Sequence, residues 1–403
     1  MRRLKEPLPD FWAKGKLDTQ FLIYTIALLL VGLVTLYSAS YPWGYLKFTN
    51  PTYYIKHQLV YAALGVAAML IVSKVNYKYF RILAIVGFCV SIVLLLVVLV
   101  TPEQRAGFKR WLKIGPLPQF QPSEVAKVFL VMFLAWAMER YYRLITGKGL
   151  RDSDRMTKSG KLLPPFIVSL KPTFLLGGVI ILVAGLVYVE NHHSGAILLA
   201  VLGIAMLYIG EFRRGWFILA AALILAVAMI VIAKPELLKE YAGERIIAWL
   251  DKSFEPLGAR WQTNQSLNAI GSGGLFGAGL GNSIQKYYYV SESFNDMIFS
   301  IYAEEMGFVF CVALLVLFCL FIGRGVIIAI RARDRFGAYM TMGYMVHVGL
   351  QVLLNIAVAT DSIPNTGISL PFFSSGGTAL VMLMFELGVV LSVSRSAYIS
   401  KQK

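Results

Sequence analysis

Charged side chains are scarce in this chain of 403 residues. They make up 15% of the sequence, whereas about a quarter of the residues in a soluble domain are charged. Apolar residues make up 58%, the mean hydropathy is +0.67, and no polar stretch is long enough to bury a core of its own. The scarcity of charge therefore excludes a soluble globular protein and predicts a single domain that crosses a membrane several times.

Cysteine and histidine are rare as well. The three cysteines, Cys89, Cys311 and Cys319, all lie inside apolar runs, which excludes a disulfide framework and a zinc site built on paired cysteines. The four histidines show no metal-ligand spacing: His192 and His193 are neighbours, which on a helix point about 100° apart. We therefore assign no metal ligand and no cofactor, and leave open only an assisting divalent cation, Mg²⁺ or Mn²⁺.

Long apolar runs, each near the length of about 20 residues that crosses a bilayer as a helix, follow one another along the chain. We predict ten spans, at 19–40, 56–73, 79–101, 122–142, 171–190, 194–210, 215–233, 295–323, 337–360 and 371–396. The expected fold class is an all-α polytopic membrane protein. Its parts are an N-terminal tail (1–18), one transmembrane domain (19–396) with a long loop (234–294) between the seventh and eighth spans, and a C-terminal tail (397–403).

The distribution of positive charge predicts the orientation of these spans. With the N-terminus inside, the inner segments carry 25 of the 38 Lys and Arg residues and the outer segments carry 12. Because short cytoplasmic segments are enriched in Lys and Arg, both termini are expected in the cytoplasm and the 234–294 loop outside the cell. Topology thus explains the net charge of +16 without nucleic-acid binding; the alternative is contact with anionic lipid or with an acidic partner surface.

The segment 261–308 is the longest polar, glycine-rich passage between membrane-like runs. Six glycines fall between Gly271 and Gly281, which permits backbone conformations that other residues rarely adopt. A lone carboxylate, Asp296, follows just before the next apolar run, and the adjacent Glu304 and Glu305 come after it. A backbone able to lie against a ligand, next to a fixed acid at a membrane edge, predicts a functional site. The alternative role for Asp296 is a helix N-cap.

Two ionisable residues, Glu124 and Lys127, occupy the outer end of the fourth predicted span. Being three residues apart on a helix, they share a face and can pair. Such groups at membrane depth face a cavity or a partner, so either a site or a structural ion pair is expected. The outer segment before them contains Arg110 and Trp111 within a cluster of cations. That cluster suits phosphate oxygens, or alternatively anchors the chain at the interface.

Two outer passages are irregular in different ways. The segment 235–254 begins with a proline and has apolar residues on one side and charges on the other, which predicts an amphipathic helix in the outer interface. The segment 361–380 contains two prolines and three glycines between apolar spans. Its backbone is expected to dip toward the membrane while lining a cavity.

Several motifs together resemble one family. They are RWLKIGPLPQFQPSEVAK (110–127), HSG (193–195), QTNQSLNAIGSGGLFGAGLGNSIQK (262–286), FNDMIFSIYAEEMGF (294–308) and IPNTGISLPFFSSGG (363–377), with Arg245 and Trp249 in R-x-x-x-W spacing. The chain resembles the SEDS proteins, the family of FtsW, RodA and SpoVE, over nearly its whole length. The last motif is more similar to the division and sporulation branch than to the elongation branch.

The resemblance implies an inverting peptidoglycan glycosyltransferase. Such an enzyme polymerises lipid II at the outer face of the cytoplasmic membrane, releases undecaprenyl pyrophosphate, and works with a class B penicillin-binding protein and other divisome or elongasome proteins. It implies that Asp296 is the catalytic base. The substrate-binding residues that it implies are Arg110, Trp111, Glu124, Lys127, Arg245, Gln265, Ser266, Lys286 and Glu304.

Two alternatives compete with an enzyme. A flippase or transporter for a lipid-linked sugar would also need a polar cavity, but it should place site residues near the bilayer midplane and show an inverted repeat. The polar residues singled out above lie at the outer ends of the spans, and no repeat is visible. A scaffold for division partners would not need a glycine-rich loop beside a lone carboxylate. The sequence favours the enzyme.

Overall fold

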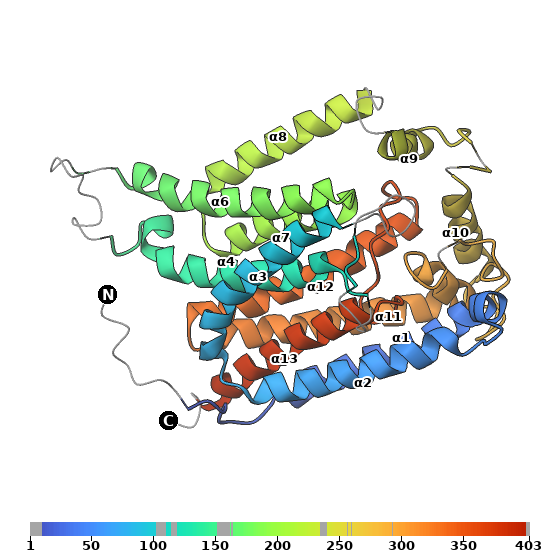
Figure 1. The fold of residues 1–403 in the computed structure, drawn as a ribbon, viewed down its shortest axis with the longest axis horizontal. Helices are drawn as coiled ribbons and strands as arrows, with labels where there is room; N and C mark the ends of the chain where they lie inside the picture. Colours follow the sequence, from blue (N-terminus) through green and yellow to red (C-terminus); the bar gives the residue numbers. More distant parts are fainter. Residues whose placement is uncertain are drawn as a thin grey trace.

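The computed structural model describes residues 10–101, 110–113, 119–150, 162, 164–233, 240–255, 257–258, 260–291 and 293–399. Ten long helices and three short ones make up the described part of the chain (Figure 1). The long helices are α1 (Thr19–Phe48), α2 (Tyr53–Lys74), α3 (Phe80–Val100), α4 (Pro122–Thr146), α6 (Pro165–Val189), α7 (His193–Ile209), α8 (Arg214–Ala233), α11 (Ile298–Ile330), α12 (Arg335–Ala359) and α13 (Gly377–Ile399). The short ones are η2 (Tyr77–Tyr79), α9 (Glu240–Leu250) and α10 (Trp261–Ser272).

Each of the ten predicted spans coincides with one long helix, which confirms the all-α membrane fold. In the part of the chain that the structure describes, seven of these helices are long and apolar enough to cross a membrane by length and composition. The remaining three are α7 and α8, which provide shorter apolar stretches, and α4, which carries several charged side chains. The division into tails and one domain stays a prediction, since residues 1–9 and 400–403 lie outside the described ranges.

The sequence explains where several helices begin and end. Asp18 caps α1 because its Oδ1 accepts a hydrogen bond from the Phe21 amide at 3.0 Å. α4 begins at Pro122, which lacks the amide hydrogen that a first helical turn does not need, and ends at Gly147 in the left-handed conformation. α12 is capped by Asp334, whose Oδ1 accepts from the Gly337 amide at 2.9 Å.

Several boundaries differ from the prediction: α1 and α11 extend beyond their predicted ends at 40 and 323, and α6 begins before its predicted start at 171. Three further differences concern the polar segments. The last span begins at Gly377 instead of residue 371, because the preceding residues form a loop. The segment 261–272, expected as part of a polar loop, is the helix α10. The amphipathic helix is shorter than expected: α9 covers Glu240–Leu250, and its predicted start at Pro235 lies outside the described residues.

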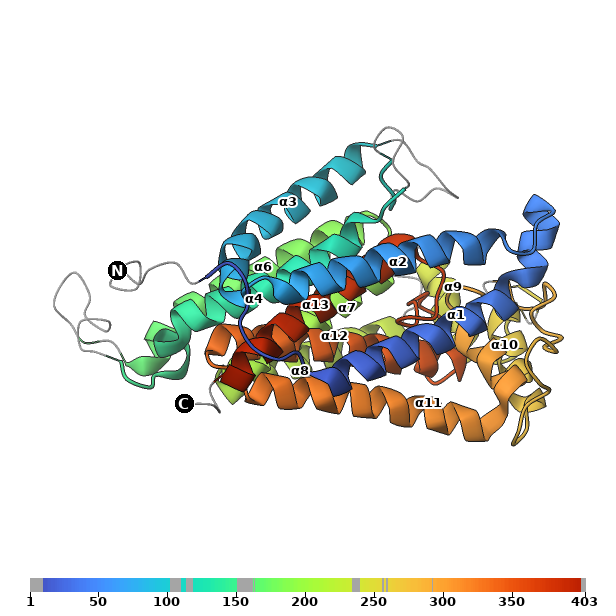
Figure 2. The same ribbon diagram turned by 90° about the horizontal axis from the view of Figure 1, so that it is seen from below.

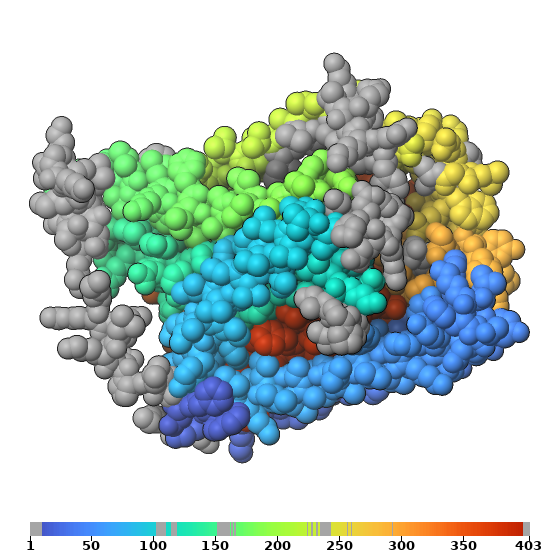
Figure 3. Space-filling model, in the orientation of Figure 1, coloured from blue at the N-terminus to red at the C-terminus, as the bar shows by residue number. Residues whose placement is uncertain are grey.

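The long helices run roughly along one axis, with α9 and α10 at one end of the bundle (Figure 1). The segment before α1 and the end of α13 lie together at the other end of the bundle, where Arg395 donates to the Gly15 carbonyl at 2.9 Å. At the same end, Arg324 on α11 pairs with Asp18 at the start of α1 at 2.7 Å. Ten crossings would place both termini on one membrane face, which agrees with this arrangement. Figure 2 shows α3 inclined away from α2, and in the space-filling view part of α13 is visible between these two helices (Figure 3).

Candidate functional site

A cavity of about 360 Å³ lies near the α9–α10 end of the bundle, between α4, the start of α7, α12, α13 and the loop before α13. Five residues singled out from the sequence line it: Arg110, Trp111, Glu124, Lys127 and Asp296. Four of them come from the segment 110–127 and Asp296 lies far from it in the chain, so the fold brings half of the ten predicted site residues together. Its walls combine positive, negative and neutral polar groups.

Asp296 lies in the connection just before α11 and is partly buried. The cap position of α11 is taken by Met297, so Asp296 lies one residue outside it and the N-cap explanation is not supported. Gly367 faces the carboxylate: a Cβ at this position would stand 3.0 Å from Asp296 Oδ2, and the backbone there has a φ of +69°. A glycine is therefore needed both for the turn and to leave room beside the acid.

The second part of the irregular passage, from Gly367 to Gly376, lines the cavity, as expected from its prolines and glycines, and is bonded to the segment that carries Asp296. Ser374 Oγ accepts from the Leu370 amide at 2.8 Å and donates to the Asn295 carbonyl at 2.7 Å. The buried side chain of Asn355 on α12 completes the link, since its Nδ2 donates to the carbonyls of Asp296 and Ile368, both at 2.7 Å. The position of the acid is thus fixed through its own backbone.

The predicted ion pair between Glu124 and Lys127 is present at the first turns of α4. Lys127 Nζ lies 2.7 Å from Glu124 Oε2, and the two side chains are 5% and 12% exposed, respectively. Pro122 at the start of α4 puts both residues on the cavity side of the helix. A buried pair is favourable only when both charges keep their partner, so either residue alone would leave an uncompensated charge.

Arg110 is held against the turn between α6 and α7. Its guanidinium donates to the Asn191 carbonyl and its charge acts on Glu190, which is buried. Burial raises the pKa of Glu190 to about 8, although the nearby Arg110 opposes this shift. Burial, with Arg110 and Lys127 beside it, lowers the pKa of His192 to about 3, so this imidazole is neutral. Other cations of the predicted cluster, Arg105 and Lys109, lie outside the described residues.

The sequence analysis missed a polar pair deeper in the cavity, in the middle of two spans. His347 on α12 and Glu386 on α13 both line it, with 3.0 Å between His347 Nδ1 and Glu386 Oε2. The signal was available, because ionisable residues inside apolar runs are rare and functional as a rule. The spacing of the two residues in the sequence does not show that they pair across two helices. The expectation that polar residues crowd the outer ends of the spans is therefore incomplete.

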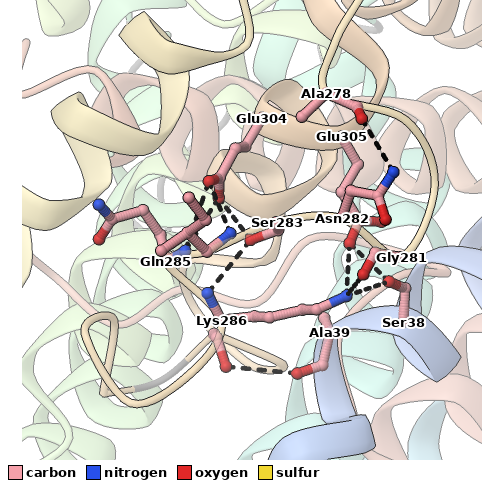
Figure 4. A network of polar contacts seen from close by, with 12 residues as sticks. Ser38, Ala39, Ala278, Gly281, Asn282, Ser283, Gln285, Lys286, Glu304 and Glu305 are labelled. Carbon is pink, nitrogen blue, oxygen red and sulfur yellow. Dashed lines mark hydrogen bonds and ion pairs between the residues drawn. The ribbon is translucent and has the colours of Figure 1, made fainter.

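The glycine-rich passage lies elsewhere, packed on α11 (Figure 4). Lys286 Nζ contacts Glu305 Oε1 at 2.9 Å, and Glu304 accepts hydrogen bonds from Ser283 Oγ and from the Ile284 amide. These four polar side chains and the Gly271–Gly281 stretch are absent from the described lining of the cavity. Part of this backbone lies against α11, because a Cβ on Gly273 or Gly277 would collide with it, and contact of the rest with a ligand stays a prediction. A part for Lys286 and Glu304 in substrate binding stays a prediction.

The remaining candidates connect elements around the site. Arg245 Nη1 on α9 donates to the Asn365 carbonyl at 2.9 Å, which ties the amphipathic helix to the cavity loop. Ser266 is fully buried, with 2.5 Å between its Oγ and Ser300 Oγ, and it donates to the Ala359 carbonyl at 2.7 Å. Gln265 is also buried, and its Oε1 accepts from Asn268 at 3.4 Å. None of these three lines the cavity, so their role in binding also stays a prediction.

A resident metal has no obvious ligand set here. Within the described ranges, no three His, Cys, Asp or Glu side chains come together closely enough to hold an ion. Arg110 and Lys127 instead bring fixed positive charge into the cavity. The site can therefore bind an anion through cations and act on a proton through Asp296.

Comparisons with known proteins agree with this geometry. The model of the FtsW, RodA and SpoVE family, described as "Cell cycle protein", matches residues 19–399. The stage V sporulation protein E of Bacillus subtilis is 33% identical over 383 residues, which are 94% of this chain and 97% of that protein. A probable peptidoglycan glycosyltransferase FtsW of Trichlorobacter lovleyi is 31% identical over 379 residues, with 94% and 93% of the two chains covered.

A solved structure is similar over almost the whole fold. It is described as "Structural coordination of polymerization and crosslinking by a peptidoglycan synthase complex". One chain of it superposes with a TM-score of 0.72 at 25% identity, and the match covers 95% of this chain and 98% of that one. The arrangement of helices around the cavity is therefore shared with a protein of known architecture.

Proposed function

The chain belongs to the family of FtsW, RodA and SpoVE, and from this membership we propose a mechanism for its cavity. It is a multi-pass membrane protein and a peptidoglycan glycosyltransferase. That activity removes the flippase and the scaffold as main functions. We propose that the substrate is lipid II, that the division and sporulation branch is the nearer one, and that Asp296 is the catalytic base.

The observation that carries the proposal is that Asp296 shares one cavity with Arg110 and Lys127. A sugar hydroxyl is a poor nucleophile until a base removes its proton. In the proposed step, the Asp296 carboxylate takes that proton while the hydroxyl oxygen bonds to the anomeric carbon of the donor. The bond from that carbon to the pyrophosphate oxygen breaks, and its electron pair leaves with the pyrophosphate. One displacement of this kind inverts the anomeric centre.

The two cations of the cavity would stabilise the pyrophosphate leaving group. Charge develops on the pyrophosphate oxygens as the bond breaks, and positive groups fixed in a cavity stabilise it more than water does. Arg110 is anchored by the Asn191 carbonyl, and Lys127 by Glu124 at 2.7 Å. Because both are held in place, they need little reorganisation during the reaction. The lipid tail would enter laterally, and the space between α2 and α3 through which α13 is visible suits that path (Figure 3).

The orientation and the partner belong to the same proposal. The Lys and Arg distribution favours cytoplasmic termini, which puts the cavity near the outer face of the cytoplasmic membrane. The similar structure comes from a complex described as coordinating polymerisation and crosslinking. A class B penicillin-binding protein that crosslinks the new strand is the expected partner of this chain, with other division or elongation proteins around it.

The test replaces Asp296 by asparagine in the purified protein, which keeps the shape of the side chain and removes the base. Loss of a general base typically slows a reaction by about 10²–10⁴-fold, so polymerisation of labelled lipid II should nearly stop while the protein still folds. Asp251→Asn is the matched control, because Asp251 is exposed and bonds only locally, to Ser253. Equal glycan lengths and rates from the two variants would remove Asp296 from catalysis.

A further inference from the structure

The His347–Glu386 pair is an ionisable feature of the cavity that the mechanism above does not use. Its side chains are 5% and 1% exposed, and both lie within apolar helices. Ionisable groups at such depth are expensive to bury. A pair that serves only to join α12 and α13 would explain the bond between Nδ1 and Oε2, which are 3.0 Å apart. It would not explain the other two polar atoms.

Those two atoms are His347 Nε2 and Glu386 Oε1. Each is buried, and neither finds a hydrogen-bond partner among the described residues. Buried polar atoms are almost always satisfied, and both residues line the cavity. Both atoms are covered by neighbouring groups, so a ligand reaches them only when these side chains move slightly. With Nδ1 bonded to a carboxylate, the ring is held in place and its second nitrogen either accepts or, when protonated, donates a hydrogen bond.

The charges around the pair indicate which protonation state of the pair an anionic ligand would favour. The described lining holds two cations, Arg110 and Lys127, against three carboxylates, Glu124, Asp296 and Glu386. A dianion entering these walls would therefore meet a net negative charge. One more positive charge is needed, and histidine is the side chain that ordinarily gains it near neutral pH.

The other titratable groups in the surroundings do not supply that charge. His192, at the start of α7, stays neutral because its pKa is lowered to about 3 by burial and by the neighbouring cations. Glu190, behind Arg110, has its pKa raised to about 8 and is largely protonated at pH 7. Tyr344 on α12 lies close enough to Glu386 to interact with it electrostatically, but a phenol adds no positive charge. His347 remains.

We propose that His347 and Glu386 form a proton-binding subsite, in which His347 becomes an imidazolium when a lipid-linked diester pyrophosphate occupies the cavity. The proton comes from solvent, and the only covalent bond that forms is the one between Nε2 and that proton. Nδ1 keeps its hydrogen and donates it to Glu386, and the new Nε2 hydrogen is donated into the cavity, to a phosphate oxygen or to a water beside it. This inference rests on the proposed function, because it takes lipid II as the occupant.

The subsite makes binding depend on pH. If one proton is taken up with each lipid, the affinity falls by up to about tenfold for each unit of rising pH. The reciprocal statement is that the lipid stabilises the imidazolium. Without His347 the cavity would bind the same lipid more weakly and with no such pH dependence.

Calorimetry counts the proton directly. A short-chain lipid II, whose diester pyrophosphate does not titrate near neutrality, is added to full-length protein at pH 7 in two buffers of different ionisation enthalpy. Asp296→Asn is present throughout, so that no turnover occurs and this acid takes no proton. The lining then holds two cations and two carboxylates, and a dianion that enters it still favours one more positive charge. EDTA removes divalent cations that would neutralise the pyrophosphate. The difference between the two heats gives the number of protons bound, and close to one per lipid is expected.

The same measurement on His347→Gln should give nearly zero. The matched control is His57→Gln, an exposed histidine on α2 whose Nδ1 lies 2.8 Å from the Tyr53 carbonyl and whose ring lies beside the Tyr53 ring, and it should still take up the proton. If His347→Gln does not fold, Glu386→Gln serves instead, because an imidazolium without its carboxylate is less stable and uptake should drop. Binding without proton uptake, or uptake that survives in the His347 and Glu386 variants, overturns the inference alone. Absence of lipid II binding overturns the proposed function and the inference together.

Discussion

Replacing Lys286 by methionine separates a structural role from a role in substrate binding. The Lys286–Glu305 pair joins the glycine-rich passage to α11 with 2.9 Å between Nζ and Oε1, and its side chains are 3% and 1% exposed (Figure 4). Methionine keeps most of the length of the side chain but removes its charge. Glu305 would then be left buried with a single remaining donor, Ser38 Oγ at 2.6 Å.

The size of the expected loss of stability depends on how deeply the ion pair is buried and not on the distance between its atoms. Removing one partner of a buried ion pair typically costs about 3–5 kcal/mol, because the remaining charge has lost its compensation. Lys286→Met should therefore destabilise the protein by that amount. Adding Glu305→Gln removes the second charge, and the double variant should recover about 1–3 kcal/mol relative to simple addition of the two single losses.

The control is the Lys148–Glu211 pair, which is closer in distance but lies in solvent. Its atoms are 2.6 Å apart, and its side chains are 68% and 49% exposed. Exposed pairs contribute little because water and salt screen them. Lys148→Met should leave stability within experimental error. The assay is reversible unfolding in mixed micelles, together with the KM for lipid II of the folded variants.

Two results would contradict this reasoning. If Lys286→Met and Lys148→Met destabilised the protein equally, burial of the pair would not matter as argued. If Lys286→Met kept its stability but raised KM, the side chain would contact substrate, as the motif resemblance implies. The expected outcome, a large loss of stability with an unchanged KM, assigns Lys286 to the fold.

The other predictions concern the cavity and the topology. A double-mutant cycle between Glu124→Gln and Lys127→Met should give a coupling energy of about 1–3 kcal/mol in stability, and a value near zero would contradict the pair. Burial raises the pKa of Glu190 from 4.5 to about 8, so stability should fall by up to about 5 kcal/mol as the pH rises between these values, and Glu190→Gln should flatten that curve. In a chain without its native cysteines, a membrane-impermeant maleimide should label a cysteine at Ser253 in spheroplasts and not one at Ser153; the reverse would refute the orientation.

The fold could be predicted because a bilayer makes its demands locally. A helix that satisfies its own backbone and carries about 20 apolar residues is visible in any window of sequence. The starts of α1 and α4 are similarly local, since Asp18 and Pro122 act within one turn. The predicted start of the last span, at residue 371, was wrong because Pro371 belongs to an apolar stretch that forms a loop. That loop is held by Ser374, which bonds to Leu370 and Asn295.

The glycine-rich passage shows why the site was harder to predict. High glycine content indicates that backbone approaches something closely, but not what it approaches. Here a Cβ on Gly273 or Gly277 would collide with carbonyl groups of α11, and α11 itself is kinked at Gly307, where φ is +78°. These two glycines thus serve contact between two parts of one chain. A ligand-binding loop has the same composition, so the sequence alone could not separate the two.

In the structure, a contact within the chain and a ligand-binding site can be distinguished by whether their polar groups already have hydrogen-bond partners. An ammonium group has three hydrogens to donate, and those of Lys286 have Glu305, Ser38 and the Gly281 carbonyl as acceptors. A phosphate could bind there only by displacing one of them. In the cavity, by contrast, His347 and Glu386 each keep a buried atom without a protein partner. Because an unsatisfied buried group is costly, the chain retains it where a ligand or water repays the loss, and this criterion directs experiments on binding to the cavity.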